Sequence, residues 1–137
     1  MSAQYTAVGT ATGRKGRGYT TDGKLDVRLD LPKELGGGDA GTNPEQLFAV
    51  GYAACFASAM EAIAGKRKLD VSEVSTTAEV GLGADGKGGF ELSVTLRVEF
   101  PEGFDGTTAR ELVDATHQFC PYSRATRGNI PVEIVVE

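Results

Sequence analysis

The sequence predicts an α+β fold in which antiparallel sheets pack around a buried central helix. Apolar and polar side chains alternate in residues 25–31, 74–83 and 90–100, as in strands with one solvent-exposed face. Residues 44–65 carry apolar side chains in almost every direction around a helical axis, which indicates a helix buried on most sides. The predicted order is β-β-helix-β-β-helix-β, without internal repeats, and this order is typical of the α+β class. At 137 residues, the chain fits a single domain covering 1–137.

Two strands are expected near the start of the chain, at residues 5–12 and 25–31. Residues 13–18 and 21–23 carry the glycine and aspartate typical of turns, so we expect turns between the strands. Residues 32–41 should form a flexible connection. It is not a phosphate loop, because no Gly-Lys-Ser/Thr follows its glycines.

The central helix has a clear predicted start. Asn43 can cap it, Pro44 suits its first turn, and Gln46 stands three residues after the cap. We expect this helix to run to about Gly65.

The second half of the chain is predicted to contain a hairpin, a helix and a last strand. Strands at 74–83 and 90–100 flank a glycine-rich loop, and 130–136 alternates again as the closing strand. Between them, Thr107 or Thr108 is expected to cap a second helix. That helix should end near Cys120, because the following proline disfavours helical geometry in the residue before it.

Composition indicates a globular protein that folds in water, with 40% hydrophobic and 24% charged residues. A net charge of −5 argues against nucleic acid as the main partner. No secretory signal is visible, and the apolar stretch 47–64 is interrupted by Ser58 and Glu61, which makes it too mixed for a membrane span. We therefore expect a soluble, cytoplasmic protein.

The two cysteines are the main candidates for chemistry. In the cytoplasm structural disulfides rarely persist, but an oxidisable pair can serve catalysis or sensing. Cys55 and Cys120 form no Cys-x-x-Cys motif, which excludes a thioredoxin-type pair. With the lone His117 they make a poor zinc site, because structural zinc needs four ligands. We expect neither a metal nor a bound cofactor.

Cys55 lies well inside the central helix, where a cysteine is often only a small buried hydrophobic residue. A reactive thiol must ionise, and at an ordinary pKa only about 3% is thiolate at pH 7. The helix dipole fades within the first turn, so it cannot favour the anion here. A cation must do so, and arginine suits the task because it stays protonated while a carboxylate holds its other edge.

Three motifs closely resemble the organic hydroperoxide resistance (Ohr) proteins of the Ohr/OsmC family, and the resemblance covers essentially the whole chain. The motifs are Gly41-Thr42-Asn43-Pro44-Glu45-Gln46-Leu47-Phe48, Gly51-Tyr52-Ala53-Ala54-Cys55-Phe56, and Cys120-Pro121-Tyr122-Ser123 followed by Ala125-Thr126-Arg127-Gly128-Asn129.

The resemblance implies a thiol peroxidase for alkyl or lipid hydroperoxides, built as an intertwined, obligate homodimer. It implies that Cys55 attacks the peroxide and becomes a sulfenic acid, and that Cys120 condenses with it to a disulfide. Dihydrolipoyl groups on a lipoylated protein would reduce that disulfide. An arginine held by Glu45 would activate Cys55.

The arginine is less clearly marked than the cysteines. The family usually has Gly-Gly-Arg-Asp/Glu-Gly, whereas this chain has Gly13-Arg14-Lys15-Gly16-Arg17. Counting back from Thr21-Asp22 favours Arg14, with Arg17 as the alternative, and either could be only a solvated loop charge. Arg124 also replaces an asparagine common in the family, outside the proposed roles.

Helix geometry separates Glu45 from Cys55. A straight helix places them about 15 Å apart along its axis, too far for one guanidinium to bridge easily. We therefore predict that Arg14 and Glu45 reach Cys55 across a dimer interface. As an acid in the first helical turn, Glu45 also favours the positive end of the helix dipole, and both uses can coexist.

Other candidates carry less weight. His117 is assigned no role, because a lone histidine is more often a surface or partly packed residue. Four aromatic residues could line an apolar substrate pocket or simply fill the core: Phe48, Phe56, Phe119 and Tyr122.

Two alternative functions remain open. One is the OsmC branch of the same family, with a different substrate preference, although Cys120-Pro121-Tyr122-Ser123 and Arg127-Gly128-Asn129 favour the Ohr branch. The other is a non-catalytic redox sensor or binding module whose cysteines are simply buried.

Overall fold

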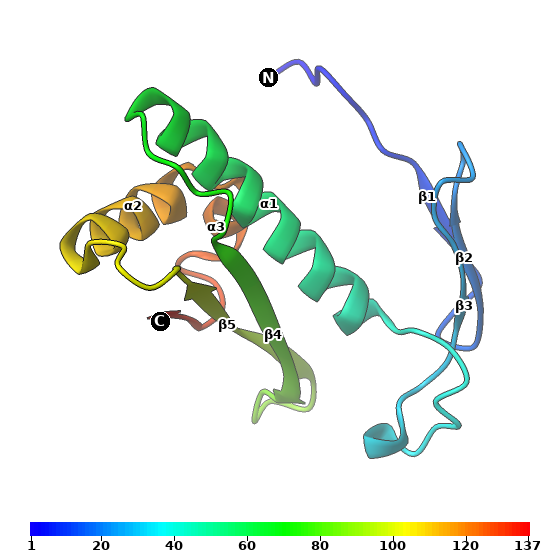
Figure 1. The fold of residues 1–137 in the computed structure, drawn as a ribbon. Coiled ribbons are helices and arrows are strands. Elements are labelled where there is room, and N and C mark those ends of the chain that lie inside the picture. Colours follow the sequence, from blue (N-terminus) through cyan, green and yellow to red (C-terminus); the bar gives the residue numbers. More distant parts are fainter. The chain divides into compact units, whose positions relative to one another are not determined.

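The computed structural model describes residues 1–137 and confirms the α+β class. The chain forms two compact units, 1–47 and 48–137. Each unit contains a three-stranded sheet, and most of the helical residues belong to the second (Figure 1).

The first unit is an antiparallel sheet in the order β1-β2-β3. Its strands are β1 (Gly9–Ala11), β2 (Gly16–Thr20) and β3 (Asp26–Leu29). The prediction of turns throughout 13–18 is wrong, because β2 already begins at Gly16. Glycine weakens strand propensity, but the two flanking strands supply ladder partners on both sides of β2.

The connection after β3 is more ordered than the sequence predicts. It contains a short 3₁₀ helix, η1 (Lys33–Leu35), and the Asp30 carboxylate accepts a hydrogen bond from the Ala40 amide at 3.0 Å. A Cβ atom at Gly37 or Gly41 would collide with the neighbouring backbone, so these glycines allow close packing instead of flexibility.

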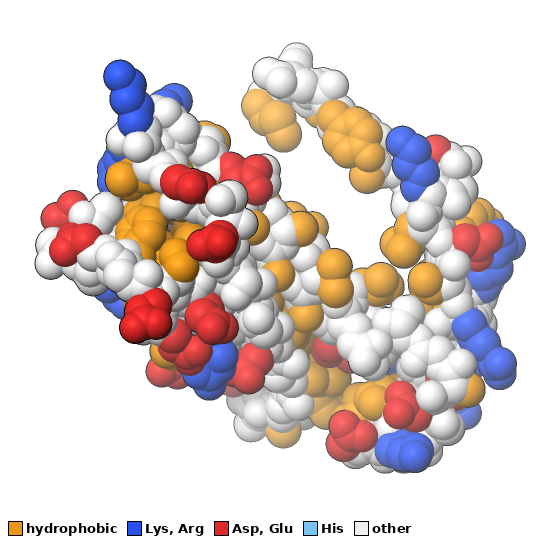
Figure 2. All heavy atoms as spheres, viewed as in Figure 1, with side chains coloured by type: hydrophobic (Ala, Val, Ile, Leu, Met, Phe, Trp, Pro, Cys, Tyr) orange, Lys and Arg blue, Asp and Glu red, His pale blue; other side chains and the backbone are white.

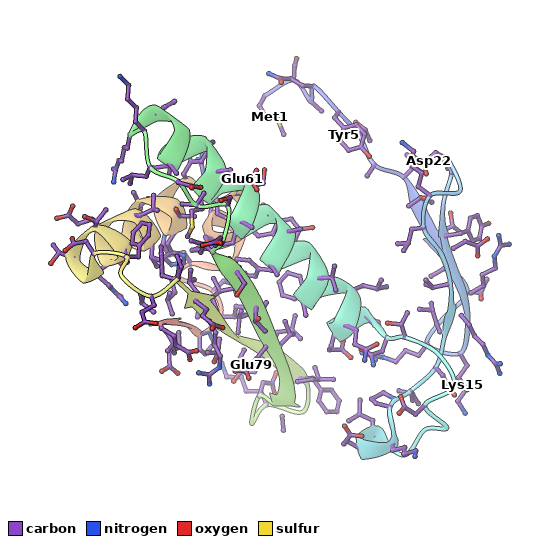
Figure 3. The ribbon with its side chains drawn as sticks, viewed as in Figure 1. Met1, Tyr5, Lys15, Asp22, Glu61 and Glu79 are labelled. Atoms are coloured by element: carbon purple, nitrogen blue, oxygen red, sulfur yellow. The ribbon has the colours of Figure 1, made fainter.

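Helix α1 (Pro44–Lys66) starts and ends as predicted. The side chain of Asn43 accepts a hydrogen bond from the Gln46 amide at 2.8 Å, which confirms its capping role. A smaller part of the helix surface is buried than predicted, however, because Val50 is 71% exposed and Glu61 projects from the outer side of the helix (Figure 3). Only one stripe of α1 is fully packed within the chain.

The prediction that α1 is too mixed for a membrane span needs correction. By length and composition, this 23-residue helix is apolar enough to cross a membrane. One such helix is weak evidence for a membrane protein, since the core helix of a soluble protein passes the same test. Tyr52, Phe56 and Met60 of α1 are packed in the core of the second unit.

The second unit contains the sheet β4-β5-β6 and two more helices. Its elements are β4 (Ser75–Ala84), β5 (Phe90–Glu99), α2 (Gly106–Phe119), α3 (Pro121–Thr126) and β6 (Val132–Val136). The first two strands form the predicted antiparallel hairpin, but β6 pairs parallel to β5. The chain crosses over through both helices before β6, and such a crossover returns a strand in the same direction.

The core of this unit lies between α1, β5 and α2 (Figure 1). Alternate residues of β5 are buried, as the period of a half-buried strand requires. Helix α2 is capped by Asp105, which accepts a hydrogen bond from the Thr108 amide at 2.9 Å, and not by Thr107 or Thr108 as predicted. The main buried side chains are Tyr52, Phe56, Met60, Val94, Leu96, Val98, Leu112 and Val113.

Candidate active site

The two cysteines meet in the second unit, although 65 positions separate them. Their sulfur atoms lie 3.6 Å apart, within hydrogen-bonding range for thiols, and both cysteines are free. Cys120 is completely buried, whereas Cys55 is partly exposed. A reactant from solvent therefore has access to Cys55 and not to Cys120.

Local sequence explains where Cys120 sits. It is the single extended residue between α2 and α3, with φ −64° and ψ 124°. Pro121 stops α2 and fixes the first turn of α3, the position in a helix where proline is favoured. The sequence analysis placed the end of α2 correctly but missed α3, and Pro121 as a helix start was the available signal.

The pKa of the Cys55 thiol lies above its ordinary value. Burial is the main cause, because desolvation disfavours the thiolate. The adjacent Cys120 adds to the increase, while the Tyr122 amide lowers the pKa by donating a hydrogen bond to the Cys55 sulfur. None of these influences comes from a cation, so no positive charge opposes the effect of burial on the pKa of Cys55.

Tyr122 packs over α1 beside the cysteines. Its ring stacks with Phe48 at a centroid distance of 5.9 Å and meets the edge of Tyr52 at 5.7 Å. Gly51 makes room for it, since a Cβ atom there would lie 3.3 Å from the Tyr122 hydroxyl. The absence of a side chain at this position therefore determines how closely Tyr122 approaches the helix.

An apolar cavity of about 360 Å³ opens next to this aromatic cluster. Two of the four aromatic residues considered above, Phe48 and Tyr122, line it. Phe56 is instead buried in the core and Phe119 is 56% exposed. The remaining lining residues are Leu92, Ala125, Thr126, Asn129 and Ile130.

A buried cluster of hydroxyl groups, which the sequence analysis did not identify, joins α1 to α3. The Tyr52 hydroxyl is 2.8 Å from Ser123 Oγ and 3.1 Å from Thr126 Oγ1. His117 Nδ1 lies 2.8 Å from the same Ser123 oxygen. Partial burial and the charge of Arg127 lower the pKa of His117. The residue given no role from sequence thus belongs to a hydrogen-bonded chain.

Arg14 and Glu45 form an ion pair in the first unit. The guanidinium donates two hydrogen bonds to the carboxylate, at 3.0 and 3.1 Å. This fork geometry is the strong form of an arginine–carboxylate pair, and the bonds to Glu45 raise the pKa of Arg14. Arg14 is therefore held in one orientation as a permanent cation.

Arg17, the alternative candidate, pairs with a different carboxylate. It donates two hydrogen bonds of 2.7 Å to Asp26 on the neighbouring strand. Its guanidinium also lies over the Tyr19 ring, 4.4 Å from the centroid. Of the two candidates, Arg14 alone is paired with Glu45.

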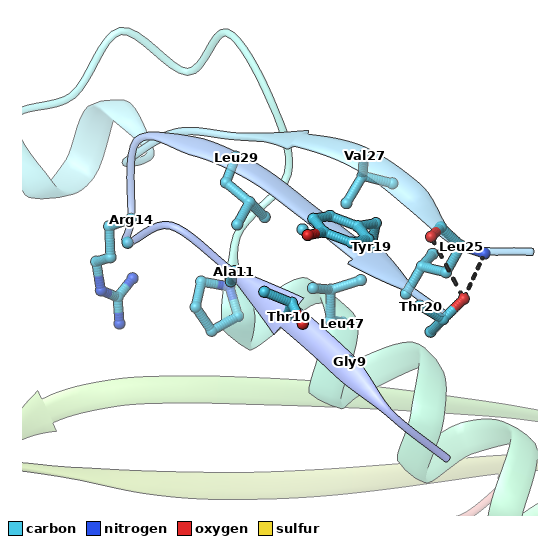
Figure 4. A pocket seen from close by; sticks show the side chains of 13 residues that line it. Gly9, Thr10, Ala11, Arg14, Tyr19, Thr20, Leu25, Val27, Leu29 and Leu47 are labelled. Atoms are coloured by element: carbon cyan, nitrogen blue, oxygen red, sulfur yellow. Dashed lines mark hydrogen bonds between the residues drawn. The ribbon is translucent and has the colours of Figure 1, made fainter. Parts of the chain in front are cut away.

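One face of the first unit is an apolar hollow of about 430 Å³, with Arg14 at one end (Figure 4). Side chains from the sheet and the start of α1 line it. At the opposite end, the Thr20 hydroxyl accepts a hydrogen bond from the Leu25 amide and donates one to the Leu25 carbonyl. The apolar lining residues with large side chains are Tyr19, Leu25, Val27, Leu29, Pro44 and Leu47.

The first unit has little core of its own. Leu29 is its one buried large hydrophobic residue, and Tyr5 is 79% exposed. Hydrophobic side chains are uncovered along its N-terminal segment and strands (Figure 2). A unit of this size rarely buries enough apolar surface to be stable alone.

Comparisons with known proteins agree with the motifs. A family model described as OsmC-like protein matches residues 36–135. An organic hydroperoxide resistance protein of Xanthomonas axonopodis pv. citri is 53% identical over 135 residues, covering 96% of this chain and 94% of that protein. The organic hydroperoxide resistance protein OhrB of Bacillus subtilis is 46% identical over 135 residues, covering 96% and 97%.

Solved structures give the same result. The crystal structure of an organic hydroperoxide resistance protein from Elizabethkingia anophelis matches with a TM-score of 0.93 and 44% identity, covering 100% of this chain and 99% of that one. The crystal structure of Bacillus subtilis OhrB matches with a TM-score of 0.88 and 42% identity, covering 98% and 100%.

Proposed function

The chain belongs to the Ohr/OsmC family, and from this premise we propose that it is a cytoplasmic thiol peroxidase that reduces organic hydroperoxides to alcohols. The observation that carries the proposal is the 3.6 Å separation of the Cys55 and Cys120 sulfurs, with only Cys55 open to solvent. This arrangement gives the two thiols different tasks.

In the first step the Cys55 thiolate attacks the terminal oxygen of the hydroperoxide. The O–O bond breaks, the sulfur gains the terminal oxygen as a sulfenic acid, and the alkoxide leaves and takes up a proton to become the alcohol. The amide of Tyr122, which donates to the Cys55 sulfur, favours the anion that this step needs. The apolar cavity beside Tyr122 suits the alkyl part of the substrate.

In the second step the thiol of Cys120 attacks the sulfenic sulfur of Cys55. A disulfide forms, and the sulfenic oxygen leaves as water. The sulfurs must approach from 3.6 Å to about 2.05 Å, a movement of roughly 1.5 Å. Burial of Cys120 supports its role as the resolving thiol, because it protects this sulfur from peroxide.

An external dithiol then restores the enzyme, and we assign this task to dihydrolipoyl groups carried on another protein. One thiolate of the dithiol attacks Cys55, the exposed side of the disulfide, and Cys120 leaves as a thiol. The second thiol of the reductant displaces Cys55 and closes the oxidised lipoyl ring. Both electrons of the reaction come from the reductant.

The raised pKa of Cys55 requires a positive charge from elsewhere. Arg14 supplies it in this proposal, with Glu45 holding the guanidinium in place across the interface of a homodimer. Its ion pair with Glu45 supports Arg14 over Arg17, which Asp26 and Tyr19 already engage. The same cation can stabilise the departing alkoxide.

The first unit supports the dimer on physical grounds. Its apolar hollow and its single buried large hydrophobic residue leave more apolar surface uncovered than a monomer usually tolerates. The exposed Val50 side of α1 presents a second apolar surface. A second copy of the chain covers both in this proposal.

Peroxide consumption with a dihydrolipoyl system tests the proposal. Wild type should turn over, Cys55→Ser should be inactive, and Cys120→Ser should be oxidised once at Cys55 without further turnover. Equal consumption by all three proteins would overturn the assignment. Activity with dithiothreitol but not with the dihydrolipoyl protein would overturn only the reductant.

A further inference from the structure

A chain of buried hydrogen bonds joins the helix that carries Cys55 to the segment that carries Cys120. The Tyr52 hydroxyl on α1 contacts two hydroxyls of α3, those of Ser123 at 2.8 Å and Thr126 at 3.1 Å. Tyr52 and Ser123 are completely buried, and Thr126 is only 5% exposed. Such contacts are costly to break, because a hydroxyl left without a partner in the core loses its hydration without compensation.

The spacing of these residues matches that of the cysteines. Tyr52 stands three residues before Cys55 on α1, so both lie on the same helix face. Ser123 stands three residues after Cys120. The Tyr52–Ser123 contact and the Cys55–Cys120 contact therefore join the same two segments at neighbouring positions. The hydroxyl contact thus constrains the distance between the two sulfur atoms.

The other end of this series of hydrogen bonds connects α3 to α2. Ser123 Oγ lies 2.8 Å from His117 Nδ1, and Arg127 donates a hydrogen bond of 2.8 Å to the His117 carbonyl. A helix of six residues is too short to be stable by itself. Its position thus depends on these contacts with its two neighbours.

On the basis of the proposed function, we propose that Tyr52 is a positioning residue for disulfide formation, and that it acts through Ser123 and Thr126 to hold Cys120 against Cys55. In the resolving step the Cys120 thiol replaces the sulfenic oxygen of Cys55, forming the S–S bond and releasing water. A second hydroperoxide competes for the same sulfenic acid and oxidises it to the sulfinic acid. The position of Cys120 sets the outcome of this competition.

The partition between disulfide and sulfinic acid tests this role, because it does not depend on how fast the first step is. Reduced protein is mixed with cumene hydroperoxide, and the oxidation states of Cys55 are counted by mass spectrometry over time. Tyr52→Phe keeps the ring but removes the hydroxyl. We expect about five- to tenfold slower disulfide formation and a correspondingly larger sulfinic fraction, as the loss of one buried hydrogen bond implies.

Thr116→Val is the matched control. It removes another buried hydroxyl, which bonds only to the Leu112 carbonyl of its own helix, at 2.7 Å. This variant should partition like wild type. In a second pair, Thr126→Ser keeps the hydroxyl and Thr126→Val removes it, and the partition in Thr126→Val should shift toward sulfinic acid relative to Thr126→Ser.

Each outcome decides one question. A wild-type partition in Tyr52→Phe overturns the positioning role, and so does an equal shift in Thr116→Val, which would mean general loosening of the core. The Thr126 pair decides the matter if Tyr52→Phe does not fold. A wild-type protein that forms neither sulfenic acid nor disulfide would instead overturn the proposed function itself.

Discussion

The sulfur atoms of Cys55 and Cys120 lie 3.6 Å apart, yet only Cys55 is reachable from solvent. The two thiols therefore differ in solvent exposure already in the reduced protein. Cys55, which meets peroxide and reductant in the proposed cycle, is partly exposed, and Cys120 is in the core. The order of events in the proposed cycle follows from access as much as from reactivity.

Selective labelling should reveal this asymmetry. In the folded, reduced protein we expect a bulky maleimide to modify Cys55 and leave Cys120 unmodified, because burial of Cys120 excludes the reagent. Peptide mass spectrometry after a short exposure measures this. In denaturant both residues should react equally, and labelling of Cys120 first in the folded protein would contradict the arrangement.

Removal of Arg14 should make Cys55 harder to ionise. Burial raises the pKa of Cys55, so its thiolate fraction and labelling rate increase as pH rises toward that pKa. If Arg14 supplies the opposing positive charge, Arg14→Ala should shift the labelling profile to higher pH. It should also lower kcat/KM for hydroperoxide by about 10²-fold, as loss of one charge-stabilising donor does in other enzymes.

Arg17→Ala is the control for that change. It removes the same charge from the same loop and strand region, but its partner is Asp26. The Arg17–Asp26 pair is exposed and the Arg14–Glu45 pair is partly exposed, so solvent screens both ion pairs and neither variant should lose much stability. A pH shift in Arg17→Ala and none in Arg14→Ala would reverse the assignment of the activating cation.

Gly51→Ala should separate stability from activity. Alanine in a helix is favoured over glycine by roughly 0.5–1 kcal/mol, so the protein should not become less stable. The new Cβ lies 3.3 Å from the Tyr122 hydroxyl, and the partly exposed ring must move outward. Because the Tyr122 amide bonds to Cys55, we expect kcat/KM to fall by about tenfold.

Gly65→Ala provides the comparison on the same helix. A Cβ atom there meets nothing within 4 Å. It should gain helix propensity without any change in kcat/KM. Thermal unfolding and peroxide kinetics on both variants measure the two effects, and equal kinetics for Gly51→Ala and wild type would show that the position of Tyr122 does not matter.

Much of the fold could be predicted because its signals are local. The Asn43 cap, the alternation of β5 and the end of α2 before Pro121 each depend on neighbours in the sequence. Strand β2 was missed because its glycines read as turn residues, and its partners lie on other strands. The parallel direction of β6 depends on the whole crossover, which no local pattern encodes.

In the candidate site too, local features could be predicted from the sequence, whereas contacts between distant segments could not. The two cysteines were identified by their chemistry, but their pairing came from a resemblance and not from their spacing. The Tyr52–Ser123 contact spans 71 positions and joins two residues that are ordinary in their own segments. Hydrogen bonds between distant segments depend on tertiary packing, so sequence reasoning overlooked Tyr52 and gave His117 no role.

Subunit complementation tests whether Arg14 and Glu45 act across a dimer interface. Arg14→Ala keeps Cys55, and Cys55→Ser keeps Arg14, so each homodimer lacks one part of every site. In a mixed dimer with cross-subunit sites, Arg14 of the Cys55→Ser chain faces the intact Cys55 of the other chain. Random reassortment makes half of the dimers mixed, each with one complete site, so about a quarter of wild-type activity should return.

The same experiment has a clear opposite outcome. If Arg14 serves the cysteine of its own chain, no mixed dimer contains a complete site, and the mixture stays at the level of the separate variants. Sedimentation shows whether dimers form, and native mass spectrometry of the mixture shows whether their subunits exchange. A protein that sediments at its chain mass of 14.3 kDa while fully active would exclude the shared site altogether.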